Sequence, residues 1–161
     1  MKLVLPVPDS YTCRPQPPGR LYEGGAELRV YVAPVTPLPY NLQEWGDEIV
    51  RGGLPLSQIK VLRVEDVRTA DGWPLTLFES EVADQRNPLA VVRRLHALYR
   101  FLEFGAVAVV YSTPRYVDAH RQELVALLQR GEPDLIDLQA TSIADFFAEL
   151  PGSPGSSGPA V

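Results

Sequence analysis

Hydrophobic and polar residues alternate in several segments of the chain with the two-residue period of half-buried β-strands. The alternation predicts strands over Leu28–Val35, Lys60–Arg68 and Leu75–Val82. Asp71-Gly72, which lies between the last two strands, predicts a tight hairpin turn. Ala106–Tyr111 is uncharged and rich in valine, so it predicts a central strand that is buried on both faces.

Three other segments have less regular patterns. Leu3–Val7 predicts a short edge strand, because proline is tolerated where a strand needs no ladder donor. Arg14–Gly25 contains groups of proline and glycine and predicts a loop or an irregular crossing. Val91–Glu103 fits either a strand or a short helix, because several of its leucines recur at helical spacing. We favour a strand from about Leu95 to Phe104.

Apolar residues at helical spacing predict two main helices and a shorter third one. Asn41 is a suitable N-cap for a helix that ends near Arg51, just before two glycines. Thr113 has proline at the next position and begins a second helix, which ends near Gly131. Ser142 would cap the short third helix. The apolar face of the third helix consists of Ile143, Phe146, Phe147 and Leu150.

The elements follow one another in the order ββαββββα, and the short C-terminal helix comes after them. Strands joined by short turns indicate an antiparallel sheet, so we expect an α+β fold of about six strands with the two main helices laid over its face. Residues 1–137 would form a single domain and residues 138–150 an appended amphipathic helix. Residues 151–161 are a Gly/Ser/Pro tail that we expect to be disordered.

Composition and charge narrow the possible functions of the 161-residue chain. Its formal net charge of −5 argues against a non-specific binder of nucleic acid or of anionic membranes. No run of about 18 apolar residues is present to insert into a bilayer, and the first residues lack a secretory pattern, so we expect a cytoplasmic protein. The single cysteine, Cys13, cannot form an internal disulfide, and we expect it to be inert rather than nucleophilic.

Sequence signatures of catalysis are mostly missing: Ser57–Lys60 matches Ser-x-x-Lys, but it lies in a loop that enters a strand, so we expect no catalytic geometry there. The chain has no Gly-x-Ser-x-Gly, no phosphate-binding or dinucleotide-binding glycine motif and no His-Glu-x-x-His. His120 and Glu123 lie one turn apart on the second helix and could face one metal ion, but a zinc site needs three or four ligands. His96 lies among arginines and has no such partner. We therefore expect neither a cofactor nor enzymatic activity.

Candidate partner-binding residues come from three places in the chain. Arg93 and Arg94 lie either on a solvated strand face or against an acidic patch of a partner. Trp73 follows the glycine of the hairpin turn, and its ring either anchors an interface or packs over the sheet. The apolar face of the third helix either covers an open side of the sheet or docks in a groove of another chain. The candidate set is Trp73, Arg93, Arg94, Ile143, Phe146, Phe147 and Leu150.

Several of these segments together resemble the PsbP/Mog/DcrB-like superfamily. Leu3–Tyr11 is similar to its opening strand, Lys60–Leu75 to its strand, turn and returning strand, and Leu98–Leu128 to its closing strands and final helix. The resemblance covers about Leu3–Arg130, whereas the loop Gln85–Val92 is longer than usual and the third helix is extra. The superfamily includes photosystem extrinsic proteins, a Ran-GTPase-binding factor, bacterial lipoproteins and Eag-type chaperones of type VI secretion effectors.

The resemblance implies a binding protein and no particular reaction, because most members of the superfamily are non-catalytic. We expect a chaperone- or adaptor-like module whose concave sheet face binds an apolar segment of another protein, such as a secreted effector, or a second copy of this chain. Two alternatives stay open: a small hydrolase or metal-dependent enzyme on the same fold, and a structural subunit of a larger assembly. The resemblance assigns no functional residue.

Overall fold

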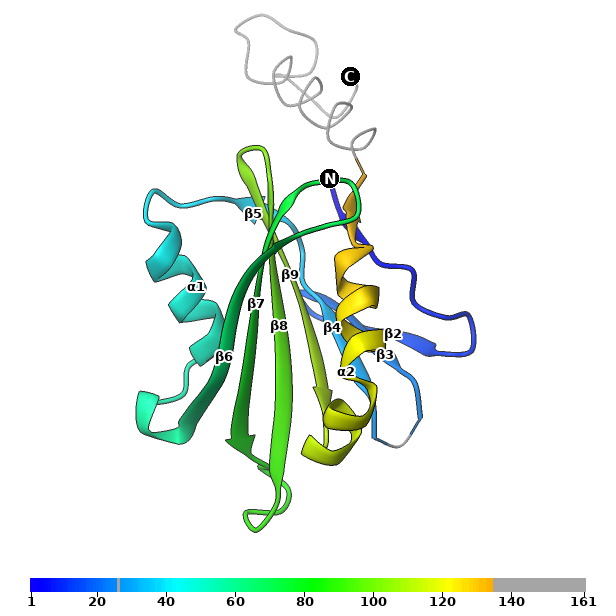
Figure 1. Ribbon diagram of the computed structural model, residues 1–161, viewed down its shortest axis with the longest axis vertical. Coiled ribbons are helices and arrows are strands. Elements are labelled where there is room, and N and C mark those ends of the chain that lie inside the picture. Colours follow the sequence, from blue (N-terminus) through cyan, green and yellow to red (C-terminus); the bar gives the residue numbers. More distant parts are fainter. Residues whose placement is uncertain (26, 135–161) are drawn as a thin grey trace, which may run out of the picture.

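The computed structural model describes residues 1–25 and 27–134. Its fold is α+β, with a large antiparallel sheet that carries one helix on each face (Figure 1). The elements are β1 (Leu3–Val4), β2 (Thr12–Gln16), β3 (Gly19–Glu23), β4 (Arg29–Val32), β5 (Thr36–Pro37), α1 (Leu42–Arg51), the 3-10 helix η1 (Leu56–Gln58), β6 (Ile59–Arg68), β7 (Pro74–Ala83), β8 (Val91–Phe101), β9 (Phe104–Ser112), α2 (Pro114–Gln129) and β10 (Glu132–Pro133).

The large sheet has eight strands in the described part of the chain, in the order β2-β3-β4-β9-β8-β7-β6, and β5 pairs with the first residues of β9. Strands β6 to β9 follow one another as antiparallel hairpins, as predicted. The predicted fold class is confirmed, with more strands than expected. β1 and β10 form a separate pair, so the edge strand predicted over Leu3–Val7 is reduced to Leu3–Val4.

Residues 12–23 form a hairpin, and the loop predicted over Arg14–Gly25 is wrong. β2 and β3 pair along their whole length, and the turn between them contains a cis Pro17-Pro18 peptide bond. The prolines favoured a loop in the sequence analysis, yet β2 is an edge strand. On an edge, a residue such as Pro15, which has no N–H, is tolerated because the outer side needs no ladder bond.

β8 is a strand, as we favoured over a helix, but it begins at Val91 rather than near Leu95. A turn at Leu102 and Glu103 separates β8 from β9. The leucines of β8 recur at helical spacing because both faces of the strand are covered. Leu95 packs on the α2 side and Leu98 on the α1 side. A strand that is buried on both faces lacks the polar alternation by which strands are identified.

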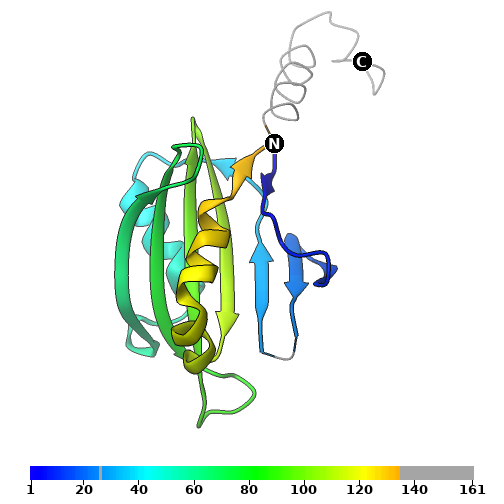
Figure 2. The ribbon, with the colours of Figure 1, turned by 45° about the vertical axis from the view of Figure 1, so that its right-hand side comes forward.

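The two helices cover opposite faces of the sheet, so the expectation that both are laid over one face is wrong (Figure 1, Figure 2). On the α1 face, Trp45 and Ile49 pack against a small cluster that includes Val107. Trp45 lies so close to Gly105 that a Cβ there would be 2.7 Å from the Trp45 Cζ2 atom. On the other face, three α2 residues complete the main core: Val117, Leu124 and Leu128.

The ends of the helices agree with the sequence signals. Asn41 Oδ1 accepts a hydrogen bond from the Glu44 N–H at 3.1 Å, and Thr113 Oγ1 accepts one from the Tyr116 N–H at 3.1 Å. Gly52 ends α1 with a φ of 55°, in the left-handed region that favours glycine. Over residues 1–25 and 27–134, no helix is both long enough and apolar enough to cross a membrane.

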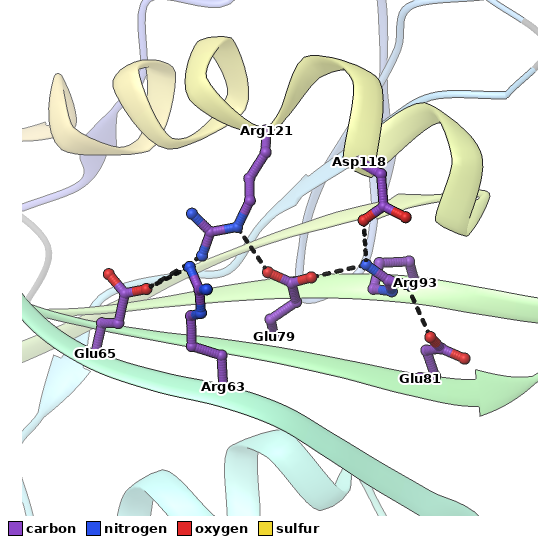
Figure 3. Close-up of polar contacts among 7 residues, drawn as sticks. All are labelled: Arg63, Glu65, Glu79, Glu81, Arg93, Asp118 and Arg121. Atoms are coloured by element: carbon purple, nitrogen blue, oxygen red, sulfur yellow. Dashed lines mark hydrogen bonds and ion pairs between the residues drawn. The ribbon is translucent and has the colours of Figure 1, made fainter.

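A group of charged side chains joins α2 to the sheet (Figure 3). Arg93 Nη1 donates to Glu79 Oε2 at 2.7 Å and to Asp118 Oδ1 at 2.9 Å, and its Nη2 donates to Glu81 Oε1 at 2.8 Å. The side chains of Arg93 and Glu79 are both more than nine-tenths buried. We call the following residues the α2 charge network: Glu65, Glu79, Glu81, Arg93, Asp118 and Arg121.

Arg121 forms the second half of this network. Its Nε donates to Glu79 Oε1 at 2.9 Å and its Nη2 to Glu65 Oε1 at 3.3 Å, so Glu79 is held by two guanidinium groups. The preceding residue, His120, departs from helical geometry with φ of −120° and ψ of 18°. The kink therefore lies between the two residues of α2, Asp118 and Arg121, that bind the sheet.

The last strand of the sheet order, β6, has apolar residues on its surface. Val61 is 52% exposed, Leu62 38% and Val64 52%. Within the described residues β6 pairs only with β7, so its outer edge has no partner strand. Lys60 and Arg63 interrupt this apolar run with positive charges.

Replacing Arg93 with methionine tests how much the α2 charge network contributes to stability. The substitution leaves Glu79 buried with less compensation, and breaking a buried ion pair costs about 3–5 kcal/mol. We expect the free energy of unfolding in urea to fall by about 3 kcal/mol or more in Arg93→Met. Arg63→Met removes an exposed ion pair with Glu65 and should change it by less than about 1 kcal/mol. Equal losses in the two variants would contradict this assignment.

Candidate functional site

α1 covers only part of its face of the sheet, and a cavity lies beside its C-terminal end. The 10 residues of α1 span about 15 Å, whereas the 11 residues of β8 span about 36 Å. The cavity opens between the end of α1, the loop after β7 and strands β4, β9 and β8, and its volume is about 740 Å³. We call it the α1-side cavity. Its lining includes Tyr31, Ile49, Leu54, Arg94, His96, Val109 and Tyr111.

β8 places Arg94 and His96 in this cavity because alternate residues of a strand point to the same face. Their neighbours Arg93 and Leu95 point to the α2 face, where Leu95 joins the main core. The adjacent arginines of β8 therefore lie on opposite sides of the sheet, in different environments.

Arg94 is buried in the wall of the cavity, with an exposed fraction of 6%. Its Nε donates to Ser80 Oγ at 3.2 Å and its Nη2 to the Val50 carbonyl oxygen at 2.9 Å. Both acceptors are neutral, and no carboxylate of the described residues forms an ion pair with this guanidinium. Burial lowers the pKa of Arg94, although arginine in proteins stays protonated. The cavity thus contains a buried positive charge that no carboxylate of the described residues pairs with.

His96 lies on the same face of β8, two residues from Arg94, and is 3% exposed. Its Nδ1 atom is buried and has no hydrogen-bond partner among the described residues. Burial, with a contribution from the neighbouring charge of Arg94, lowers the pKa of His96 to about 3. The imidazole is therefore neutral at physiological pH, with one nitrogen as a donor and the other as an acceptor.

Two aromatic residues form the wall of the cavity near β4. The Arg29 guanidinium carbon lies 6.0 Å from the centroid of the Tyr111 ring, which is a distance for a cation–π contact. Burial raises the pKa of Tyr111, and the nearby charges of Arg94 and Arg29 oppose this effect. Tyr31 faces the same cavity from β4. The polar groups are thus cationic or neutral along this wall.

The structure corrects the environment expected for the two arginines. Arg93 is 7% exposed and Arg94 6%, so a solvated strand face is wrong for both. The strands on either side and the two helices bury them. Arg93 already binds three carboxylates of this chain, whereas Arg94 has none. Sequence alone could not separate them, because the difference depends on which face each one meets.

Trp73 is half-buried and packs over the sheet, with its ring centroid 5.5 Å from that of Phe101 at an interplanar angle of 82°. This edge-to-face arrangement is a favoured geometry for aromatic pairs. A role for Trp73 in binding a partner stays a prediction. The remaining four candidates of the third helix lie outside the described residues: Ile143, Phe146, Phe147 and Leu150.

His120 and Glu123 are neighbours on α2, with His120 Nδ1 3.6 Å from Glu123 Oε2 and both side chains exposed. They lie on the helix that covers the face opposite the α1-side cavity. No group of three His, Cys, Asp or Glu side chains with the geometry of a metal site occurs in residues 1–25 and 27–134. Cys13 is exposed on β2.

The sequence analysis did not identify the α1-side cavity, although the sequence held a signal for it. In the hairpin of β8 and β9, Arg94 pairs with Tyr111 and His96 with Val109. Because alternate residues of a strand point to the same face, counting from the turn between β8 and β9 places these four residues on one face of the sheet. What the sequence could not show is that α1 ends before it covers them.

Several solved structures resemble this one, and they include the following three. The cyanobacterial PsbP protein (CyanoP) of Synechocystis has a TM-score of 0.62 and 12% identity, over 81% of this chain and 86% of CyanoP. The Ran-binding protein Mog1p of Saccharomyces cerevisiae has a TM-score of 0.54 and 12% identity, over 81% of this chain and 89% of Mog1p. LpqN of Mycobacterium tuberculosis, which is involved in cell envelope biogenesis, has a TM-score of 0.53 and 11% identity, over 80% of this chain and 81% of LpqN.

These similarities show the fold. The chain has the fold of PsbP and Mog1p, which confirms the resemblance seen in the sequence. A scan against protein-family models and a search of curated proteins both found no match.

The depressed pKa of His96 predicts a specific pH dependence of stability. Unfolding exposes the imidazole, whose pKa returns from about 3 to its ordinary value of 6.5, so the unfolded state binds more protons between these values. The contribution of His96 to stability is complete above pH 6.5 and is lost as pH falls toward 3, at up to about 1.4 kcal/mol per pH unit. The difference in unfolding free energy between the wild type and His96→Leu should shift by this amount in urea titrations. A difference that is independent of pH between 6.5 and 4 would contradict the assignment.

Proposed function

We propose that this chain is a non-catalytic binding protein, similar in role to an adaptor or chaperone, which receives an apolar segment of a partner protein in the α1-side cavity. The observation that carries the proposal is the incomplete cover of the sheet by α1. Beyond Arg51 the cavity is lined by half-buried apolar side chains, such as Ala33, Val82 and Val92, over a floor that includes the buried Val107 and Val109.

The chemistry of the cavity supports this proposal. Apolar side chains come from the end of α1 and the segment after it, and from three strands of the sheet. Its volume of about 740 Å³ is within the range of sites that bind ligands or short segments. Strands that are already paired and buried form the floor, so the site is preformed. The apolar lining comprises Ala33, Ile49, Leu54, Val82, Val92, Val107 and Val109.

The structural neighbours support a binding role at the level of class. Mog1p is named for its binding of Ran, and a protein partner is therefore compatible with this fold. A secreted effector and a second copy of the chain are both partners within the proposal. A cytoplasmic location stays a prediction from the sequence.

The enzyme alternative gains no specific support from the described residues. His120 and Glu123, which would begin a metal site, are exposed on α2 and separated from the α1-side cavity by the sheet. A structural subunit of a larger assembly stays a separate prediction from the sequence.

Site-specific crosslinking tests the proposal. A photoreactive benzoyl-phenylalanine in place of Leu54, on the rim of the cavity, should crosslink the partner in cells, and mass spectrometry should identify an apolar peptide at the crosslink. The same group in place of Leu102, which is 65% exposed in the turn after β8, is the control position. Crosslinking that is equal at both positions, or that maps to polar segments, would contradict the proposal.

A variant whose cavity is filled by a larger side chain tests whether the partner binds there. Ala33→Phe adds a ring inside the cavity, whereas Ala70→Phe adds the same ring at an exposed position in the turn between β6 and β7. We expect Ala33→Phe to reduce crosslinking from Leu54 by about tenfold, as the loss of a buried contact of about 1.4 kcal/mol implies, and Ala70→Phe to leave it unchanged. Equal crosslinking in the two variants would show that the partner binds elsewhere.

A further inference from the structure

The α1-side cavity holds a buried cation, Arg94, that forms no ion pair within the described chain. Arg94 is buried, and its two hydrogen bonds go to the Ser80 hydroxyl and the Val50 carbonyl, both neutral acceptors. Burying a charge without an opposite charge is unfavourable, because the loss of hydration is not offset. On the other face of the same strand, Arg93 binds three carboxylates. Of these two adjacent arginines, only Arg94 is buried without a carboxylate partner in the described chain.

A second polar group in the same cavity also lacks a partner. The Nδ1 atom of His96 is buried and has no hydrogen bond within the described residues. Buried polar atoms are nearly always hydrogen-bonded, so an unpaired one is unusual. The other such side-chain atom among the described residues, Nε of Arg93, belongs to a guanidinium that already binds three carboxylates, whereas His96 Nδ1 belongs to a side chain that lines a cavity. Two residues along a strand advance by about 7 Å, which brings Arg94 and His96 within reach of one bound ligand.

The charged residues around the cavity favour an anion. Three arginines line it, and Asp84 is its one carboxylate among the described residues, so the lining has a formal charge of 3 − 1 = +2. The whole chain carries −5, so this positive charge is local. Asp84 Oδ1 already accepts the backbone N–H of Arg86 at 2.9 Å, and Arg29 has no ion pair within the described residues but contacts the Tyr111 ring.

Besides the two tyrosines near β4, the cavity has aliphatic walls. Ile49 and Leu54 approach from the α1 side, and Val107 and Val109 from β9. A ligand that satisfies both parts of the site carries a negatively charged group next to an aliphatic body. A planar carboxylate fits the fork of donors of a guanidinium group, and it can also accept from an imidazole N–H.

We propose that the cavity recognises a carboxylate attached to an aliphatic segment, with Arg94 as the group that binds the carboxylate and His96 beside it. The inference rests on the proposed function and specifies its ligand: the apolar segment of the partner ends in, or carries, an acidic group. Arg94 and Arg29 bind the anion, and the side chains of α1 and β9 bind the aliphatic part.

Binding of four simple probes to the full-length, ¹⁵N-labelled chain tests this inference by NMR. Two probes are octanoate and octanol, and two are the acetylated tetrapeptide Leu-Val-Gly-Leu with a free carboxylate or with a carboxamide. We expect octanoate and the acid peptide to shift the Arg94 Nε–Hε and His96 ring resonances. Octanol and the amide peptide should bind at least about tenfold more weakly, since a hydrogen bond to a charged group is lost.

Variants assign the preference to one side chain. Arg94→Gln should reduce the difference in affinity between the acid and amide peptides to less than about threefold, since the charged hydrogen bond is gone. Arg100→Gln, on the same face of β8 but outside the cavity, should retain it. Should Arg94→Gln fail to fold, Arg29→Gln and the comparison of acid with amide on the wild type still decide the result.

The outcomes separate this inference from the proposed function. Equal affinities for the acid and amide peptides would overturn the carboxylate preference and leave the binding of an apolar segment in place. Binding of octanoate at Arg94 without either peptide would support the carboxylate site and overturn its use for a protein segment. Failure of both octanoate and the acid peptide to shift the Arg94 resonance would overturn the inference outright.

Discussion

The alternation of side chains along β8 determines what each face of this protein can do. Because successive residues of a strand point to opposite faces, Arg93 and Arg94 enter two unlike environments although they are adjacent. Arg93 meets carboxylates of β7 and α2 and fastens the helix to the sheet. Arg94 meets neutral groups and an open cavity. A shift of β8 by one residue would exchange these roles, and the pairing with β7 and β9 prevents it.

The unequal lengths of the two helices explain why only one face is complete. α2 has 16 residues and lies along the sheet over the main core, whereas the 10 residues of α1 cover a shorter stretch (Figure 2). The glycines after Arg51 end α1 while the strands beneath it continue. An open area therefore follows from the position of a helix stop signal. The rigidity of the site comes from the sheet, and its accessibility comes from the missing helical turns.

The sequence predicted those features that depend on local chemistry. The caps Asn41 and Thr113 and the hairpin near Gly72 are set by neighbouring residues, and all are present. The hairpin of β2 and β3 was missed because its prolines are tolerated only at an edge, and edges are defined by the whole sheet. The environment of Arg93 depends on Asp118, 25 residues away, which periodicity does not reveal. The candidate site also depends on residues that are distant in the sequence, because it is formed by the packing of α1 and the strands.

The exposed edge of β6 has a consequence for how the molecules behave together. Val61 and Val64 expose apolar surface along a strand whose outer backbone groups are free within the described chain, as in a template for another strand. Lys60, Arg63, Glu65 and Asp66 place charges of both signs along the same strand, and Arg63 is paired with Glu65. Pairing two such edges would remove part of the hydration of these charged groups, which costs free energy. The apolar residues of β6 are therefore exposed on a strand whose own charged residues oppose the addition of another copy, at the opposite end of the sheet order from β2.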